Sequence, residues 1–183
     1  MAGSVVKELR EVIRPMDVVL AVLLSGLGVV LMVENMGAGS GSDVRVDSTS
    51  WLLVPVFLLA TVPVLFRRAN LIAVILVTAA AMTVHVAAFG WLVRCGAGLP
   101  LALVLAYSAG KLIGDRRQSV IALLLTIGVQ GLVLVQDSAA GLGVLPFTAV
   151  FGAVAWGIGL YVQNQAAKRV TPVAEPVTVG SRA

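Results

Sequence analysis

The sequence alternates long apolar runs with short polar or basic connections. Six runs approach the length of about 20 residues that a helix needs to cross a bilayer. They cover residues 16–35, 51–66, 70–89, 98–113, 119–136 and 144–163. Each run is continuously apolar rather than alternating, which favours helices over barrel strands. The pattern predicts an all-α integral membrane protein with six transmembrane helices, arranged as three successive hairpins.

Composition supports the same conclusion. Hydrophobic residues make up 59% of the chain and charged residues 12%, and the mean hydropathy is +1.02. Soluble domains carry about 45–50% apolar and about 25% charged residues, so a water-soluble chain could not cover this much apolar surface. The one cysteine, Cys95, excludes an internal disulfide, and the one histidine is not a metal site by itself. We expect no metal and no cofactor.

The basic residues predict the orientation, because Lys and Arg are retained on the cytoplasmic side. With a cytoplasmic N-terminus, only Arg45 and Arg94 fall in outer loops. The inner segments then hold the other eleven basic residues, which are Lys7, Arg10, Arg14, Arg67, Arg68, Lys111, Arg116, Arg117, Lys168, Arg169 and Arg182. We expect a multi-pass protein of the inner (plasma) membrane with both termini in the cytoplasm. Arg67–Arg68 and Arg116–Arg117 would form two basic cytoplasmic turns.

The net charge of +4 does not indicate nucleic-acid binding. The basic residues form small clusters between apolar runs, a spacing that suits a membrane surface better than a phosphate backbone. The expected partners are therefore the lipid bilayer and other membrane proteins, with no nucleic acid.

Three regions are expected along the chain. Residues 1–15 predict a cytoplasmic amphipathic segment, because apolar residues between Val5 and Ile13 recur at helical spacing beside Lys7 and Arg10. A simple topogenic charge cluster is the alternative for this segment, and a cleavable signal peptide is a competing interpretation of the first forty residues. Residues 16–163 form the six-helix membrane domain, and 164–183 a disordered cytoplasmic tail.

Small residues predict where the helices pack. Lipid tails are as apolar as leucine, so helices in a bilayer associate through close approach at small side chains. Two stripes at four-residue spacing are expected to form packing faces: Gly98, Ala102, Ala106 and Gly110 on the fourth run, and Ala149, Ala153 and Gly157 on the sixth. Use of one stripe for dimerisation is the alternative. Pro55 and Pro63 in the second run each remove a backbone hydrogen bond and predict a kink.

His85, Gln130 and Thr126 make up the candidate polar site inside the membrane. Ionisable residues are costly there and are functional hypotheses by default. A proton relay or pH sensor would need partners at similar depth, and Gln130 with Thr126 one turn away are the polar groups expected at that depth. The sequence favours a neutral His85 that is hydrogen-bonded to a neighbouring helix over such a relay or sensor.

Motifs for catalysis are absent from the sequence. It contains no P-loop, no glycine-rich dinucleotide turn, no metal-binding His-Glu helix and no serine nucleophile elbow. The glycines at 26–28 fall inside an apolar run, which excludes a phosphate loop. We expect no catalytic residues and a protein that is not an enzyme.

Three motifs resemble a known family. Arg14-Pro15 with Asp17 opens the first helix, Pro63 precedes Arg67 and Arg68 at an inner turn, and Tyr107-Ser108 precedes a basic loop. Over residues 10–169 the chain resembles the N-terminal multi-helix membrane domain of actinobacterial sensor histidine kinases of the nitrate-response type. In such kinases the last membrane helix continues into a phosphorylated dimerisation helix and an ATP-binding domain, which this sequence does not contain. Asn70 also stands where that family would have a proline.

The resemblance implies a sensor-type membrane module without kinase activity. Its expected role is signal sensing, or partnership with a membrane histidine kinase or a second copy of itself. A small transporter or channel subunit is the alternative from another class, although a transporter should place more ionisable or helix-breaking groups at the midplane. A structural or assembly subunit is the third hypothesis.

Overall fold

The regular structure is helical throughout the described part of the chain, apart from one backbone bridge between Leu92 and Asp137. The structure is a computed structural model that describes residues 13–38 and 44–170. Its elements in chain order are α2 (Pro15–Gly37), α3 (Leu53–Thr61), η1 (Val62–Phe66), α4 (Leu71–Phe89), α5 (Cys95–Leu112), α6 (Arg116–Leu134), η2 (Leu142–Val144) and α7 (Leu145–Val170). The predicted all-α class is confirmed.

Helix length and composition identify a multi-pass membrane protein. α2, α4, α5, α6 and α7 are each long and apolar enough to cross a bilayer. The sixth apolar segment, Leu53–Phe66, is shorter and consists of α3 followed by the 3-10 helix η1. The change from α3 to η1 comes two residues before Pro63, which has no N–H to continue the α-helical ladder.

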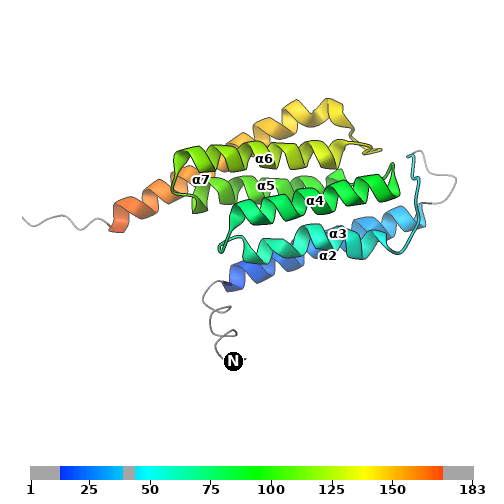
Figure 1. The fold of residues 1–183 in the computed structure, drawn as a ribbon, viewed down its shortest axis with the longest axis horizontal. Helices are drawn as coiled ribbons and strands as arrows, with labels where there is room; N and C mark the ends of the chain where they lie inside the picture. The colour runs from blue at the N-terminus through cyan, green and yellow to red at the C-terminus, as the bar shows by residue number, and fades with distance from the viewer. Residues whose placement is uncertain (1–12, 39–43, 171–183) are drawn as a thin grey trace, which may run out of the picture.

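The helices α2 to α6 lie roughly parallel in one bundle, and α7 crosses it obliquely (Figure 1). α3 packs between α2 and α4, while α7 packs mainly on α5. α4 packs on α3 and α6 much more than on its chain neighbour α5. The helices α4 and α5, which the sequence predicts as the middle hairpin, therefore do not pack as a pair. Instead, α6 packs beside α4.

The two ends of the bundle differ in character. We call one the basic end, because it carries Arg14, Arg67, Arg68, Lys111 and Arg116. The other is the loop end, formed by the segments 44–52, 90–94 and 135–144. At the basic end, Asn70 accepts a hydrogen bond from the Ala73 amide and Asp115 one from the Gln118 amide. These two side chains cap α4 and α6 where they enter the apolar layer.

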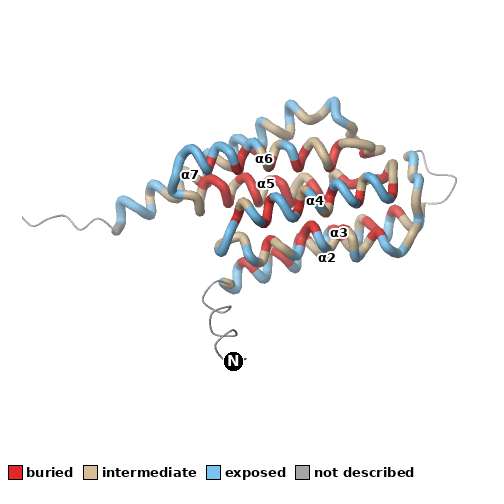
Figure 2. The backbone as a smooth tube through the Cα atoms, in the orientation of Figure 1, coloured by how far each residue is buried: buried red, intermediate tan, exposed pale blue. Residues whose placement is uncertain are grey.

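The core runs along the centre of the bundle, between α2, α3, α4, α5 and α6 (Figure 2). Its fully buried side chains include Phe57, Met82 and Leu105. α7 contributes little to it and exposes a row of bulky apolar side chains, among them Phe147, Phe151 and Ile158. Within a bilayer such a face contacts lipid, so its exposure is compatible with a folded membrane protein.

Helix boundaries differ from the predicted runs at three places. α5 begins at Cys95 rather than 98, α6 begins at Arg116 rather than 119, and α7 continues to Val170, past residue 163. The added turns of α6 and α7 carry charged and polar residues, whereas the added turn of α5 consists of residues 95–97, Cys-Gly-Ala. The predicted amphipathic segment and tail fall mostly in 1–12 and 171–183, outside the described residues.

Candidate functional site

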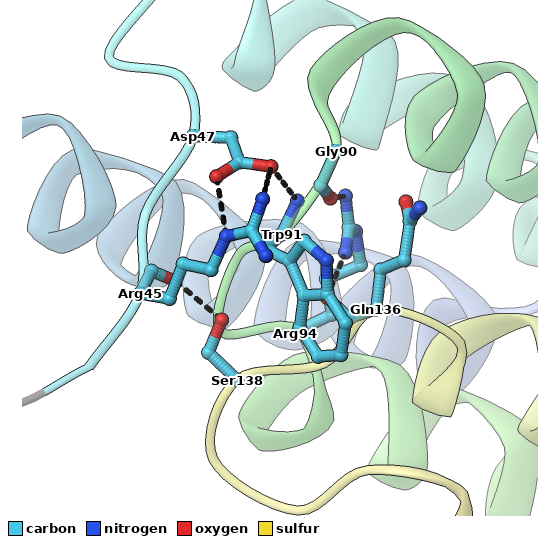
Figure 3. Close-up of polar contacts among 7 residues, drawn as sticks. All are labelled: Arg45, Asp47, Gly90, Trp91, Arg94, Gln136 and Ser138. Atoms are coloured by element: carbon cyan, nitrogen blue, oxygen red, sulfur yellow. Dashed lines mark hydrogen bonds and ion pairs between the residues drawn. The ribbon is translucent and has the colours of Figure 1, made fainter.

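Arg94 is the centre of a buried polar cluster at the loop end. The sequence predicts an outer loop for this residue, and the structure places it in the 90–94 connection at the loop end with 0% of the residue exposed. Its Nε donates to His85 Nδ1 at 3.1 Å, its Nη1 to the Gln136 carbonyl at 3.0 Å and its Nη2 to the Gly90 carbonyl at 2.5 Å (Figure 3). We define the loop-end cluster as Asn35, His85, Arg94, Gln136 and Asp137.

Asp137 organises the start of α5 without binding the guanidinium group of Arg94. Its Oδ2 accepts from the backbone amides of Arg94 and Cys95, both at 2.7 Å, and its Oδ1 accepts from the Ala139 and Ala140 amides. The carboxylate therefore caps the N-terminus of α5 from the opposite connection. Burial lowers the pKa of Arg94 to about 10, and the charge of Asp137 opposes that shift. Arg94 thus stays a cation at neutral pH.

His85 is the member of this cluster that α4 contributes. It is fully buried, and its ring meets Phe57 and Phe89 edge-on at centroid distances of 5.6 and 5.0 Å. Since Nδ1 accepts a hydrogen bond, the proton of the neutral ring is assigned to Nε2. Nε2 is buried and has no hydrogen-bond partner among the described residues. The expected bond to a neighbouring segment therefore exists at one ring nitrogen only.

Further hydrogen bonds tie the remaining loops to the cluster. Asn35 Nδ2 donates to the Val93 carbonyl at 2.9 Å, and its Oδ1 accepts from the Val93 amide at 3.0 Å. Asp47 accepts from the Trp91 amide and pairs with Arg45, as Figure 3 shows, and the Ser138 hydroxyl donates to the Arg45 carbonyl. The hydrogen bond from Arg45 lowers the pKa of Asp47. All three loop-end connections are joined to one another.

Gln130 and Thr126 do not join His85 in a network. The Thr126 hydroxyl donates to the Ala122 carbonyl of its own helix at 2.8 Å. Gln130 is fully buried, and neither atom of its amide has a partner within the described ranges. It faces α7 at Gly152, where an added Cβ would lie 2.9 Å from Gln130 Nε2. The three residues of the predicted polar site are therefore all buried, without a hydrogen bond between them.

A second ionic cluster lies at the basic end. Asp17 is 0% exposed, and its two oxygens bind Arg67 Nη2 at 2.7 Å and Arg68 Nε at 2.6 Å. Arg67 Nη1 also donates to Ser108 Oγ on α5 at 3.1 Å. The predicted basic turn therefore clamps the start of α2 to α5. Arg116 and Arg117 in the other turn are exposed, and Arg116 lies over the Trp156 ring.

The two predicted stripes of small residues differ in their burial. Gly98, Ala102, Ala106 and Gly110 are all buried, and Gly98 contacts Val133 while Gly110 contacts the backbone of α7 at Trp156. On α7, Ala149 is half-buried, whereas Ala153 and Gly157 are exposed. The contacts come from Gly152 and Gly159 instead, and Gly159 lies against the Tyr107 carbonyl. The stripe predicted on the sixth run therefore lies outside the contact face.

The sequence did not predict that these charged residues meet in two clusters. It recognised Asp17, Arg67 and Arg94 individually, but assigned the charges to helix ends and loops. Two signals were present: Asp17 is an acidic residue at the same predicted depth as the arginine pair, and Arg94 lies four residues before the fourth apolar run. No group of three His, Cys, Asp or Glu side chains that could hold a metal occurs in residues 13–38 and 44–170.

These observations define a class of protein: a multi-pass helical membrane protein whose bundle is joined by a buried polar cluster at each end. No protein-family model matches the sequence, and neither a curated protein nor a solved structure matches it. The function is therefore argued from the site itself.

Proposed function

We propose that this chain is a non-catalytic membrane protein of a signalling system, which senses a condition at the loop end or regulates a membrane histidine kinase as its partner. The observation that supports the proposal most is the position of Arg94. Its side chain joins α4 through His85, the 90–94 connection through Gly90, and the 135–144 connection through Gln136. A change at this one side chain would affect three segments at once.

The electrostatics of Arg94 make it suited to such a role. A buried cation is costly unless it is well paired, and every acceptor that binds this guanidinium group is neutral. An anion, a change in hydration or a partner's side chain at the loop end would compete with these acceptors. Releasing His85 would alter the packing of α4 against its neighbours, and rigid helices carry such shifts to the far end of a bundle.

The proposal includes an orientation. The basic end faces the cytoplasm and the loop end faces the outside, in line with the distribution of Lys and Arg. The loop end would then meet the external signal, while the basic end would meet the cytoplasmic parts of a partner kinase.

A small transporter is the second candidate, and Gln130 is the observation that favours it. An unpaired, fully buried amide inside a membrane bundle is the type of group that lines a polar path. Arg94 and Asp17, by contrast, lie at the two ends of the apolar layer. Gln130 lies four residues before the loop-end terminus of α6, and this one polar group supports the transport hypothesis less than the loop-end cluster supports the signalling hypothesis.

The experiment compares the wild type with Arg94→Lys, which keeps the charge but loses the planar fork of donors. Tagged protein is crosslinked in membranes of its own host, and the autophosphorylation of any kinase captured with it is measured. We expect a kinase whose autophosphorylation differs at least threefold between the two forms. Thr83→Ser, on the exposed face of α4, is the matched control and should behave as the wild type.

Two results would overturn the proposal. Incorporation of phosphate from ATP into the purified chain itself would show an enzyme. Equal kinase activity with all three forms at equal membrane levels would show an assembly subunit. Solute uptake into proteoliposomes that Gln130→Leu abolishes would establish the transport alternative instead.

A further inference from the structure

A groove with two chemically different halves opens at the basic end. It has a volume of about 540 Å³ and lies between the start of α2, the second half of α5 and the η1–α4 turn. Its basic lining residues, Arg14, Arg67, Arg68 and Lys111, lie at the ends of the helices, whereas Leu20, Leu103 and Val104 line it deeper along α2 and α5. The groove therefore presents cations and an apolar wall to the same occupant.

The groove carries an excess of positive charge within the described residues, because Asp17 is the one carboxylate paired with its four basic lining residues. Both carboxylate oxygens of Asp17 are already ion-paired, one with Arg67 and the other with Nε of Arg68. The two Nη groups of Arg68 make no hydrogen bond within 13–38 and 44–170. Lys111 Nζ lies 5.3 Å from the centre of the Tyr107 ring, which is its one interaction in that part of the chain. The four basic residues Arg14, Arg67, Arg68 and Lys111, set against the one carboxylate of Asp17, leave an excess of three positive charges beside an apolar surface.

The depth of the groove in the bilayer limits which kinds of ligand could occupy it. It lies where the apolar spans α2 and α5 reach the basic end, which is the headgroup level of a bilayer. Basic pockets between membrane helices suit the phosphates of anionic lipids. The Arg68 fork matches a phosphate in geometry, while the apolar half suits an acyl chain.

We propose that this groove is a binding site for one anionic phospholipid, with its phosphate between Arg14, Arg68 and Lys111 and an acyl chain along Leu20, Leu103 and Val104. A free phosphate would use the cations but leave the apolar half empty. A zwitterionic lipid would use the apolar half but carries no net charge to offset the three cations. The proposal does not depend on the signalling role, because it is argued from the lining of the groove and involves neither Arg94 nor a partner kinase.

The test uses full-length protein, delipidated in detergent and titrated with phosphatidylglycerol or phosphatidylcholine of the same chain length. Native mass spectrometry counts the bound lipids. We expect the first phosphatidylglycerol to bind about tenfold more tightly than phosphatidylcholine. Lys111→Gln, which does not touch Asp17, should weaken that first site about fivefold, since one basic residue near a surface contributes about that much. Arg68→Gln should weaken it at least as much.

Arg117→Gln is the matched control, because it removes one charge at the same end from an exposed residue that does not line the groove. It should bind as the wild type does. Equal weakening by Arg117→Gln and Lys111→Gln would overturn the proposal in favour of general surface charge. Equal affinity for the two lipids would also overturn the proposal, because it would show that the groove binds acyl chains without recognising the anionic headgroup. Displacement of the lipid by inorganic phosphate at matched concentration would show a site for free anions.

Discussion

At the scale of single residues, two buried charges hold the ends of this bundle together. Asp17 binds two arginines from the η1–α4 turn, and Arg94 binds three neutral acceptors from α4 and two connections. Asp17 lies 50 and 51 residues from its two arginines, and Arg94 lies 42 residues from Gln136, although His85 and Gly90 are within nine residues of Arg94. Sequence alone identified the charged residues but not the pairs, because depth in the membrane and helix rotation decide which side chains meet.

Asp17→Asn should destabilise the protein by about 3 kcal/mol. The substitution leaves Arg67 and Arg68 without their carboxylate, and breaking a largely buried ion pair by removing one partner costs about 3–5 kcal/mol. The two arginine side chains are 11% and 22% exposed, so we take the lower end of that range. Thermal unfolding in detergent measures the effect. Asp115→Asn, which keeps an acceptor for capping α6, is the control and should change little.

A double-mutant cycle on His85→Leu and Arg94→Met should show strong coupling. Either single change leaves a buried polar group without its partner, whereas the double change removes both. We expect the sum of the two single-mutant losses in unfolding free energy to exceed the loss in the double mutant by about 1–3 kcal/mol. Denaturation in detergent measures all three values. Additive losses would show that the bond between His85 and Arg94 contributes nothing to stability.

At the scale of elements, sequence predicted which runs are helices better than it predicted which faces pack. The apolar runs located all six segments, because a bilayer demands continuous apolar helices. The packing face of α7 was not predictable in the same way. Lipid-facing and protein-facing sides are both apolar, so a small residue is the main signal, and α7 has several at competing spacings. Ala153 and Gly157 face outward, whereas Gly152 and Gly159 face the bundle.

Gly110→Ala and Gly157→Ala should therefore have opposite outcomes. A Cβ at Gly110 would collide with the Trp156 carbonyl and approach the Leu160 amide at 2.9 Å, which forces α5 and α7 apart. Overpacking of this kind costs about 1–3 kcal/mol. A Cβ at Gly157 meets nothing within 4 Å. Gly110→Ala should lower the melting temperature in detergent, and Gly157→Ala should not. Equal changes in melting temperature for the two variants would show that α5 and α7 do not make contact at Gly110.

At the scale of the whole molecule, the fold separates a basic end from a loop end by six apolar segments. The membrane class was predictable from composition, since no soluble surface could carry so much apolar area. The opened middle hairpin was not, because chain order does not determine whether α4 packs beside α5 or beside α6. The arrangement that results places the Asp17 cluster and the Arg94 cluster at opposite ends, where each closes one rim of the bundle.

Site-directed thiol labelling tests the six crossings and their orientation most directly. In a Cys95→Ser background, single cysteines replace Thr49 at the loop end and Gly114 at the basic end, both exposed positions. A membrane-impermeant maleimide is applied to intact cells and to permeabilised cells. The account predicts labelling of Thr49→Cys in intact cells, and of Gly114→Cys only after permeabilisation. Labelling of Gly114→Cys in intact cells, or protection of Thr49→Cys until permeabilisation, would contradict it.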